Sequence, residues 1–225
     1  MNVTVLIGTG IKDSSSVKLN CWNDRIKKEE FELVGKVIEK AYKYTIPTPL
    51  ELFKLFQETF SKVTLPNSWQ VSEPWTNTVL GVFSQIGRNL GYTPRKEYLR
   101  LDQTWEIKHP DISTIVLALE CENTDRVEEI LDDELQKLLN IKALLKVLIF
   151  YPVVPILMAE EEASYPEIQE KIRSAKIKNS DERYIVITPV YIKSQSIIEV
   201  SACSFDSEGR DEELESFQIK YTSKD

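Results

Sequence analysis

The sequence has little histidine and little cysteine. Its 225 residues include a single histidine, His109, and three cysteines, Cys21, Cys121 and Cys203. A serine–histidine–aspartate triad or a histidine metal site needs a histidine with partners, so a lone histidine argues against both. Three scattered cysteines argue against a disulfide framework or a thiolate zinc site. They favour a reducing compartment, and we expect a cytoplasmic protein.

Long apolar runs are also missing. The longest extends from Leu144 to Leu157 and is interrupted by Lys146 and two prolines, whereas a membrane span needs roughly 18 apolar residues. No basic segment followed by an apolar one opens the chain, so no secretory signal is expected. With 42% hydrophobic and 28% charged residues, the composition is typical of a globular protein with a substantial core and no membrane association.

Basic residues are outnumbered, and the net charge of −8 argues at first against nucleic-acid binding. The acids are concentrated in two windows, Glu120–Glu134 with eight acids and one base, and Asp206–Glu215 with six and one. These windows together carry −12, which leaves +4 for the rest of the chain. Two basic clusters in that remainder are candidate nucleic-acid-binding residues, although each run could equally be a solvated face. They are Arg88, Arg95, Lys96 and Arg100, and Lys171, Arg173, Lys176 and Lys178.

Hydrophobic periodicity predicts an N-terminal lobe over residues 1–70, packed on an α/β core over residues 71–225. The lobe is expected to hold a short strand at Val3–Ile7 and helices at Glu29–Tyr44 and Thr48–Ser61. Gly8 and Gly10 follow that strand without the third glycine of a dinucleotide-binding loop, so they do not indicate a phosphate site.

The core is predicted as helix, strand, strand, helix, strand, in a mixed α/β sheet. A basic helix and three antiparallel strands are expected to follow. A strand, a helix of about fifteen residues and a second strand make a crossover unit, so the two strands on either side of the second helix should be parallel. The expected ranges are Glu73–Leu90, Glu97–Ile107, Ser113–Glu122, Asp125–Ile141, Leu144–Tyr151, Pro166–Ile177, Tyr184–Ile192, Ile197–Phe205 and Phe217–Tyr221.

Carboxylates gather at one end of the most apolar strand. Glu120 and Glu122 are two residues apart, so their side chains leave the same face. A hairpin centred near Asp111 would place Asp102 directly opposite Glu120. Three converging carboxylates are unfavourable unless something compensates them, and a hard divalent cation such as Mg²⁺ or Mn²⁺ is the usual means.

The helix that follows carries a further acid in its apolar stripe. Glu134 falls inside the buried arc and Lys137 falls on its margin. A buried glutamate needs compensation, either from a metal site or from a structural pair with Lys137 or Lys146. Both explanations stay open for Glu134.

These segments resemble the PD-(D/E)xK restriction-endonuclease-like nuclease superfamily. The resemblance covers about Glu73 to Tyr151 and rests on Arg100-Leu101-Asp102-Gln103-Thr104-Trp105, on Leu117-Ala118-Leu119-Glu120-Cys121-Glu122-Asn123 and on the two elements that follow. It implies Asp102, Glu120 and the Cys121 backbone carbonyl as ligands of Mg²⁺ or Mn²⁺. Leu101 stands where the motif has proline, and Glu122 stands where its catalytic lysine is expected.

The resemblance implies hydrolysis of phosphodiester bonds, most simply in DNA. Glu122 would then act as a general base or second metal ligand, and Lys137, reaching the site from the next helix, would replace the missing lysine. Cleavage of both strands of a duplex would favour a homodimer. Two alternatives stay open: a catalytically inactive relative that only binds nucleic acid, and a protein-interaction module.

Overall fold

The computed structural model describes residues 4–6, 16–18, 46–68, 72–108, 113–122, 129–150, 158–175 and 180–223. The chain forms two compact units, Met1–Tyr44 and Thr45–Asp225. In the first unit, β1 (Thr4–Leu6) pairs antiparallel with β2 (Ser16–Lys18). The expected Glu29–Tyr44 helix and the glycines after the first strand lie outside the described residues.

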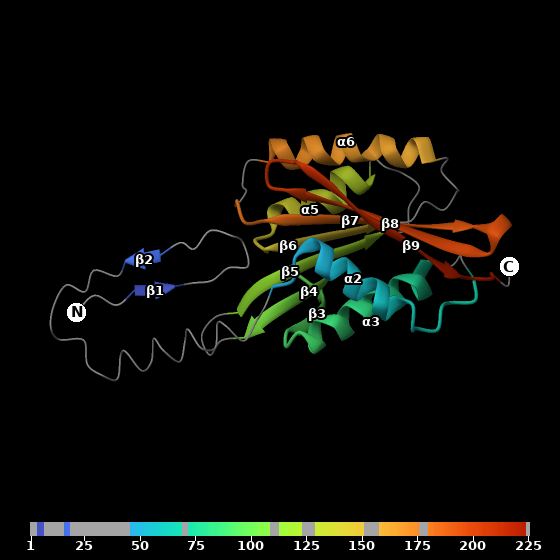
Figure 1. Cartoon of the computed structure of the whole chain (residues 1–225), viewed down its shortest axis with the longest axis horizontal. Coiled ribbons are helices and arrows are strands. Elements are labelled where there is room, and N and C mark those ends of the chain that lie inside the picture. The colour runs from blue at the N-terminus through green and yellow to red at the C-terminus, as the bar shows by residue number, and fades with distance from the viewer. Residues whose placement is uncertain are drawn as a thin grey trace. The chain divides into compact units, whose positions relative to one another are not determined.

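The second unit is built on a mixed seven-stranded sheet whose strand order follows the chain, β3-β4-β5-β6-β7-β8-β9 (Figure 1). Strands β5, β6 and β7 are parallel, and the other neighbours are antiparallel. The predicted mixed α/β class and the parallel pair are thereby confirmed. The strands are β3 (Thr93–Tyr98), β4 (Leu101–Lys108), β5 (Ser113–Glu122), β6 (Leu145–Phe150), β7 (Arg183–Ile192), β8 (Ile197–Asp206) and β9 (Asp211–Lys220).

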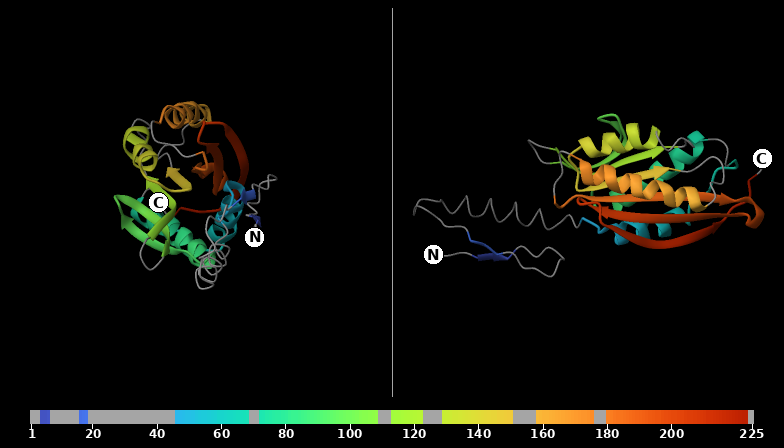
Figure 2. Two further views of the ribbon diagram at one scale, coloured as in Figure 1. Left: turned by 90° about the vertical axis from the view of Figure 1, so that its left-hand side faces the viewer. Right: turned by 90° about the horizontal axis from the view of Figure 1, so that it is seen from above.

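Helices cover both faces of this sheet (Figure 2). On one face lie α2 (Pro49–Phe60) and α3 (Ser72–Asn89). On the other lie a π-helical turn η1 (Ile130–Glu134), α5 (Leu135–Asn140) and α6 (Met158–Ser174). A 3-10 turn, η2 (Lys193–Gln195), connects β7 to β8. None of the described helices is long and apolar enough to cross a membrane.

The central strands are apolar because helices pack on both of their faces. Every residue of β6 is buried, as is the run Val116–Cys121 of β5. On the α5 and α6 side, the core joins Ile130 and Leu138 to Leu148, Ile172 and their neighbours. A crossover helix between each pair of parallel strands supplies this cover.

Helix α2 belongs to the sheet unit and not to the first unit. Thr48 and Glu51 form a capping box at its start, as the predicted helix at Thr48–Ser61 requires. Its Phe53 and Phe56 rings pack against Phe217 of β9. The division of the chain therefore falls between Tyr44 and Thr45, earlier than the expected boundary at residue 70.

The expected single strand Glu97–Ile107 is a hairpin. Strands β3 and β4 pair from Thr93↔Glu106 to Tyr98↔Leu101, and Leu99 and Arg100 form the turn. The period-two pattern runs through the turn without a glycine, proline or asparagine to mark it, so the sequence pattern hides the reversal. The sheet gains one strand more than predicted.

Other boundaries differ in their extent. Helix α6 begins at Met158 and carries Pro166 inside it, although the sequence predicted a start at that proline. Strand β9 begins at Asp211 instead of Phe217. The expected Asp125–Ile141 helix is described from residue 129, with η1 and α5 in succession.

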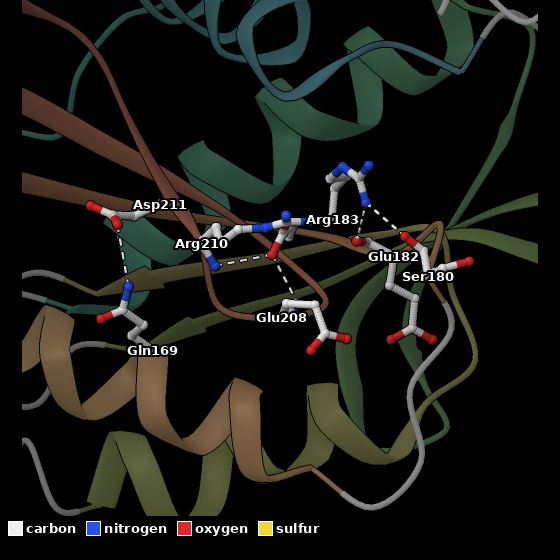
Figure 3. A network of polar contacts seen from close by, with 8 residues as sticks. Gln169, Ser180, Glu182, Arg183, Glu208, Arg210 and Asp211 are labelled. Carbon is white, nitrogen blue, oxygen red and sulfur yellow. Dashed lines mark hydrogen bonds and ion pairs between the residues drawn. The ribbon is translucent and has the colours of Figure 1, made fainter. Parts of the chain in front are cut away.

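The β8–β9 turn is held by a polar network beside α6 (Figure 3). The Asp206 carboxylate accepts hydrogen bonds from the backbone N–H groups of Glu208 and Arg210 and from Arg210 Nε. Gln169 of α6 donates to Asp211 at 3.2 Å. Gly209, at φ +71°, lies so close to the Gln169 carbonyl that a Cβ there would come within 2.8 Å of it. The turn is thereby fixed against the helix.

Candidate functional site

Asp102 and Glu120 come together across strands β4 and β5. The antiparallel register pairs Gln103 with Leu119, and one further step places Asp102 opposite Glu120, as the sequence predicts. Asp102 Oδ2 accepts a hydrogen bond from the Cys121 backbone N–H at 2.8 Å. That contact spans the two strands, so it holds the aspartate beside the end of β5.

Glu120 is deeply buried and incompletely satisfied. Only 2% of the residue is exposed, and its Oε1 has no hydrogen-bond partner among the described residues. Burial, a hydrogen bond with Glu134 and the nearby charges of Asp102 and Glu134 raise the pKa of Glu120 to about 10. Burial likewise raises the pKa of Asp102, against the opposing hydrogen bond from Cys121. The pair is therefore costly to ionise without a cation.

Lys137 is the cation that the structure supplies. Its Nζ lies 3.8 Å from Glu120 Oε2 and donates a hydrogen bond to Glu134 Oε2. Burial alone would lower the pKa of Lys137, but Glu134 and Glu120 outweigh it and the pKa is raised. Glu134 ends the π-helical turn and Lys137 lies one turn further on in α5, which directs both toward β5.

The pairing of Glu134 decides between the two structural pairs that the sequence left open. Glu134 pairs with Lys137, while Lys146 pairs with Glu182 at 2.8 Å. Glu134 thus joins Asp102, Glu120 and Glu122 as a fourth acid of the candidate site, although the sequence had marked it only as a buried glutamate in need of a partner. Its position in the apolar stripe of the helix was the signal.

Glu122 is the last residue of β5 and is half-buried. It lies opposite Phe150 of β6 in the parallel register, and strand alternation puts it on the same face as Glu120. The expected carboxylates therefore share one face, with Lys137 directed at Glu120.

The described part of the chain contains no complete set of metal ligands from side chains. Within it, no group of three or more histidine, cysteine, aspartate or glutamate side chains is arranged to hold a metal ion. The pair Asp102 and Glu120 nevertheless fits a hard cation by its chemistry, because both offer carboxylate oxygens and Glu120 Oε1 is buried with no hydrogen-bond partner in the part of the chain that the structure describes. Mg²⁺ often takes one or two protein carboxylates and completes its shell with water and phosphate.

The first basic cluster lies around the β3 edge of the sheet. Arg88 is exposed at the end of α3, Arg95 and Lys96 are exposed on β3, and Arg100 is exposed in the turn. Arg95 lies 3.6 Å from Glu106 Oε1, and its guanidinium stacks over the Tyr98 ring. Its charge is thus partly compensated, while the others face solvent.

The second basic cluster is engaged in ion pairs where it is described. Lys171 pairs with Asp132 at 2.7 Å, and Arg173 pairs with Glu170 at 3.1 Å. Lys176 and Lys178 lie outside the described residues. The structure therefore places Arg95, Lys96 and Arg100 of the first cluster beside β4, the strand that carries Asp102.

A buried polar group that the sequence did not assign lies at the start of β6 and β7. Lys146 Nζ donates to Glu182 at 2.8 Å and to the Tyr184 hydroxyl at 3.2 Å, and that hydroxyl donates to Glu182. Burial lowers the pKa of Lys146, partly offset by Glu182. A lysine inside an apolar strand indicates a buried charge that needs a partner. The sequence could not identify that partner, because Glu182 lies 36 residues away.

The chain was compared with models of known protein families and with curated proteins, and neither search found a match. The function is therefore inferred from the geometry of Asp102, Glu120, Glu134 and Lys137.

Proposed function

We propose that this protein is a metal-dependent nuclease of the PD-(D/E)xK type that hydrolyses phosphodiester bonds in DNA. The observation that carries the proposal is the pairing of Asp102 with a buried Glu120 whose Oε1 has no partner among the described residues. Lys137 approaches Glu120 from the next helix, where the resemblance expects a substitute for the missing motif lysine. Burying such a group serves no packing purpose, whereas it suits a cation site.

Asp102 and Glu120 would hold Mg²⁺ or Mn²⁺, with the Cys121 carbonyl as a further ligand. A bound Mg²⁺ supplies an acidified water and neutralises charge on the phosphate. Lys137 would keep its positive charge, since its pKa is raised, and would stabilise the extra negative charge of the pentacovalent phosphorane. Glu122 would take a proton from the attacking water or bind a second cation.

Phosphate contacts would come from the basic residues beside β4. Arg88, Arg95, Lys96 and Arg100 are exposed, and Arg100 lies two residues from Asp102. Such contacts supply most of the salt-sensitive affinity for DNA. The second basic cluster belongs to the same proposal as a further source of phosphate contacts, as do a homodimer for double-strand cleavage and a cytoplasmic location. It comprises Lys171, Arg173, Lys176 and Lys178.

A second candidate is a nuclease fold that binds nucleic acid, or another protein, without cutting. It is favoured by the absence of a three-ligand metal group among the described residues and by the engagement of Lys137 with Glu134. This candidate predicts salt-sensitive DNA binding without metal-dependent cleavage. A pure protein-interaction module predicts neither DNA binding nor Mg²⁺ binding by calorimetry.

The test is cleavage of supercoiled plasmid by the purified protein with Mg²⁺ or Mn²⁺. Asp102→Asn and Glu120→Gln should abolish nicking, and Lys137→Met should reduce it strongly, because each removes a group at the reacting phosphate. The matched controls are Glu199→Gln on β8 and Lys220→Met on β9, which should cut at the wild-type rate. Wild-type cleavage by both Asp102→Asn and Glu120→Gln would overturn the assignment.

A further inference from the structure

The turn between β3 and β4 has a strained backbone without any glycine. Leu99 and Arg100 are its two central residues, with φ of +56° and +66°, and Glu97 just before it has φ +50°. Two-residue turns with positive φ at both positions are normally formed by Asn-Gly or Asp-Gly, because other residues are strained there. Here a branched apolar residue and an arginine occupy both positions.

Packing inside the protein does not account for this choice. Leu99 is 53% exposed, the most exposed large hydrophobic residue in the part of the chain that the structure describes. Arg100 is exposed as well. Strained backbone conformations cluster at active sites and ligand-binding segments. The strained turn therefore presents an apolar tip, Leu99, and a charged neighbour, Arg100, to solvent.

The tip is next to the candidate active site. Leu99 precedes Asp102 by three residues, so their Cα atoms lie no more than about 10 Å apart, which is the rise of roughly three base pairs. The segment from Arg95 to Arg100 carries three basic residues and one acidic residue, Glu97. A positive, narrow hairpin with an apolar tip is therefore aligned with the strand that would bind the scissile phosphate.

We propose that the Leu99–Arg100 turn is a wedge that enters a nucleic-acid duplex beside the cleavage site and unstacks a base step. This inference rests on the proposed nuclease function and names its substrate as base-paired DNA that is deformed on binding. Apolar side chains inserted between base steps unstack and kink the duplex. Arg100 and Lys96 contact the flanking phosphates, which hold the tip in the groove.

The experiment uses the full-length protein, with Ca²⁺ in place of Mg²⁺, and duplex oligonucleotides that contain 2-aminopurine, a base whose fluorescence rises on unstacking. Wild-type protein should increase the fluorescence at positions near the cleavage site. Leu99→Asn relieves the strain, because asparagine tolerates positive φ, so the variant should fold at least as well. It should lose the fluorescence increase and bind duplex about tenfold more weakly.

Leu50→Asn is the matched control, since Leu50 is an exposed leucine on α2 and its replacement should leave the fluorescence signal unchanged. An unaltered signal in Leu99→Asn, with plasmid cleavage intact in the wild type, would overturn the wedge and leave the nuclease assignment standing. Absence of both cleavage and duplex binding in the wild type would overturn both. A loss of self-association in Leu99→Asn with an unchanged DNA signal would assign the tip to a contact between two copies of the chain.

Discussion

Replacing Glu120 by glutamine should make the metal-free protein more stable at neutral and alkaline pH. The pKa of Glu120 is about 10 in the folded protein and 4.5 in an unperturbed glutamate. Between these values the folded state binds one proton more than the unfolded state, so the free energy of unfolding falls as pH rises. Each pH unit in that interval costs about 1.4 kcal/mol. At about pH 7 the uptake of this proton costs roughly 3 kcal/mol, because pH 7 lies about 2.5 units above the pKa of an unperturbed glutamate.

Glutamine carries no proton to be taken up, so Glu120→Gln removes this cost. The stability difference between the variant and the wild type should therefore widen by about 1.4 kcal/mol per pH unit from about pH 6 to pH 8. Urea denaturation in the presence of a chelator measures it. Saturating Mg²⁺ should reduce the slope of the wild type, because a metal ion binds the ionised carboxylate.

Leu119→Ala is the matched control on the same strand. Leu119 is fully buried, so its truncation should cost about 2–5 kcal/mol, and the cost should be the same at every pH because no proton is involved. Parallel stability curves for wild type and Glu120→Gln would refute the reasoning, since they would mean that Glu120 ionises as easily in the fold as in the unfolded chain.

Three further changes test the framework around the site. Lys146→Met leaves Glu182 in the core without its cation and should cost about 3–5 kcal/mol by urea denaturation, most of which the double variant Lys146→Met/Glu182→Gln should recover. Gly87→Ala places a methyl group 2.8 Å from Trp105 and should cost about 1–3 kcal/mol, with a changed near-ultraviolet circular dichroism signal from that tryptophan. Burial alone would raise the pKa of Asp206, but the hydrogen bonds from Arg210 and Glu208 outweigh it and the pKa is lowered, so Asp206→Ala should cost about 1 kcal/mol at neutral pH. That cost should vanish as acid protonates Asp206 in the folded state, and a cost that persists below about pH 2 would contradict the assignment.

Local patterns predicted most of the elements. The apolar run of β5 allowed both ends of that strand, Ser113 and Glu122, to be predicted. The position of α3 was predicted from its apolar stripe. The facing of Asp102 and Glu120 could be predicted because a hairpin register depends only on the position of its centre. The bulge between Trp105 and Glu106 shifts the pairing toward the loop, but it lies beyond the residues that matter for the site.

The remaining features depend on contacts that no local pattern reports. The turn at Leu99–Arg100 lacks the residues that usually mark a chain reversal, so the sequence predicted one strand where the structure has a hairpin. The partner of Lys146 is Glu182, in a segment separated from it by a whole crossover. The approach of Lys137 to Glu120 requires α5 to cover β5 at one particular rotation, which is set by packing of Ile130 and Leu138 against the sheet.

The two acidic windows have different structural roles, and none of their described acids lies on β3, the basic edge strand of the sheet. In the first window, Glu120 of β5 and Glu134 at the end of η1 converge on Lys137, and Asp132 pairs with Lys171. The second window forms the β8–β9 turn and the start of β9, the edge strand opposite β3, where Asp211, Glu212 and Glu215 are exposed. Charges along an edge strand oppose pairing with another sheet, so that acidity protects against aggregation. The opposite edge, β3, carries Arg95 and Lys96 and borders the strand of Asp102. The net negative charge therefore leaves a basic edge beside the candidate site, which is the edge that the phosphates of the proposed DNA substrate would contact.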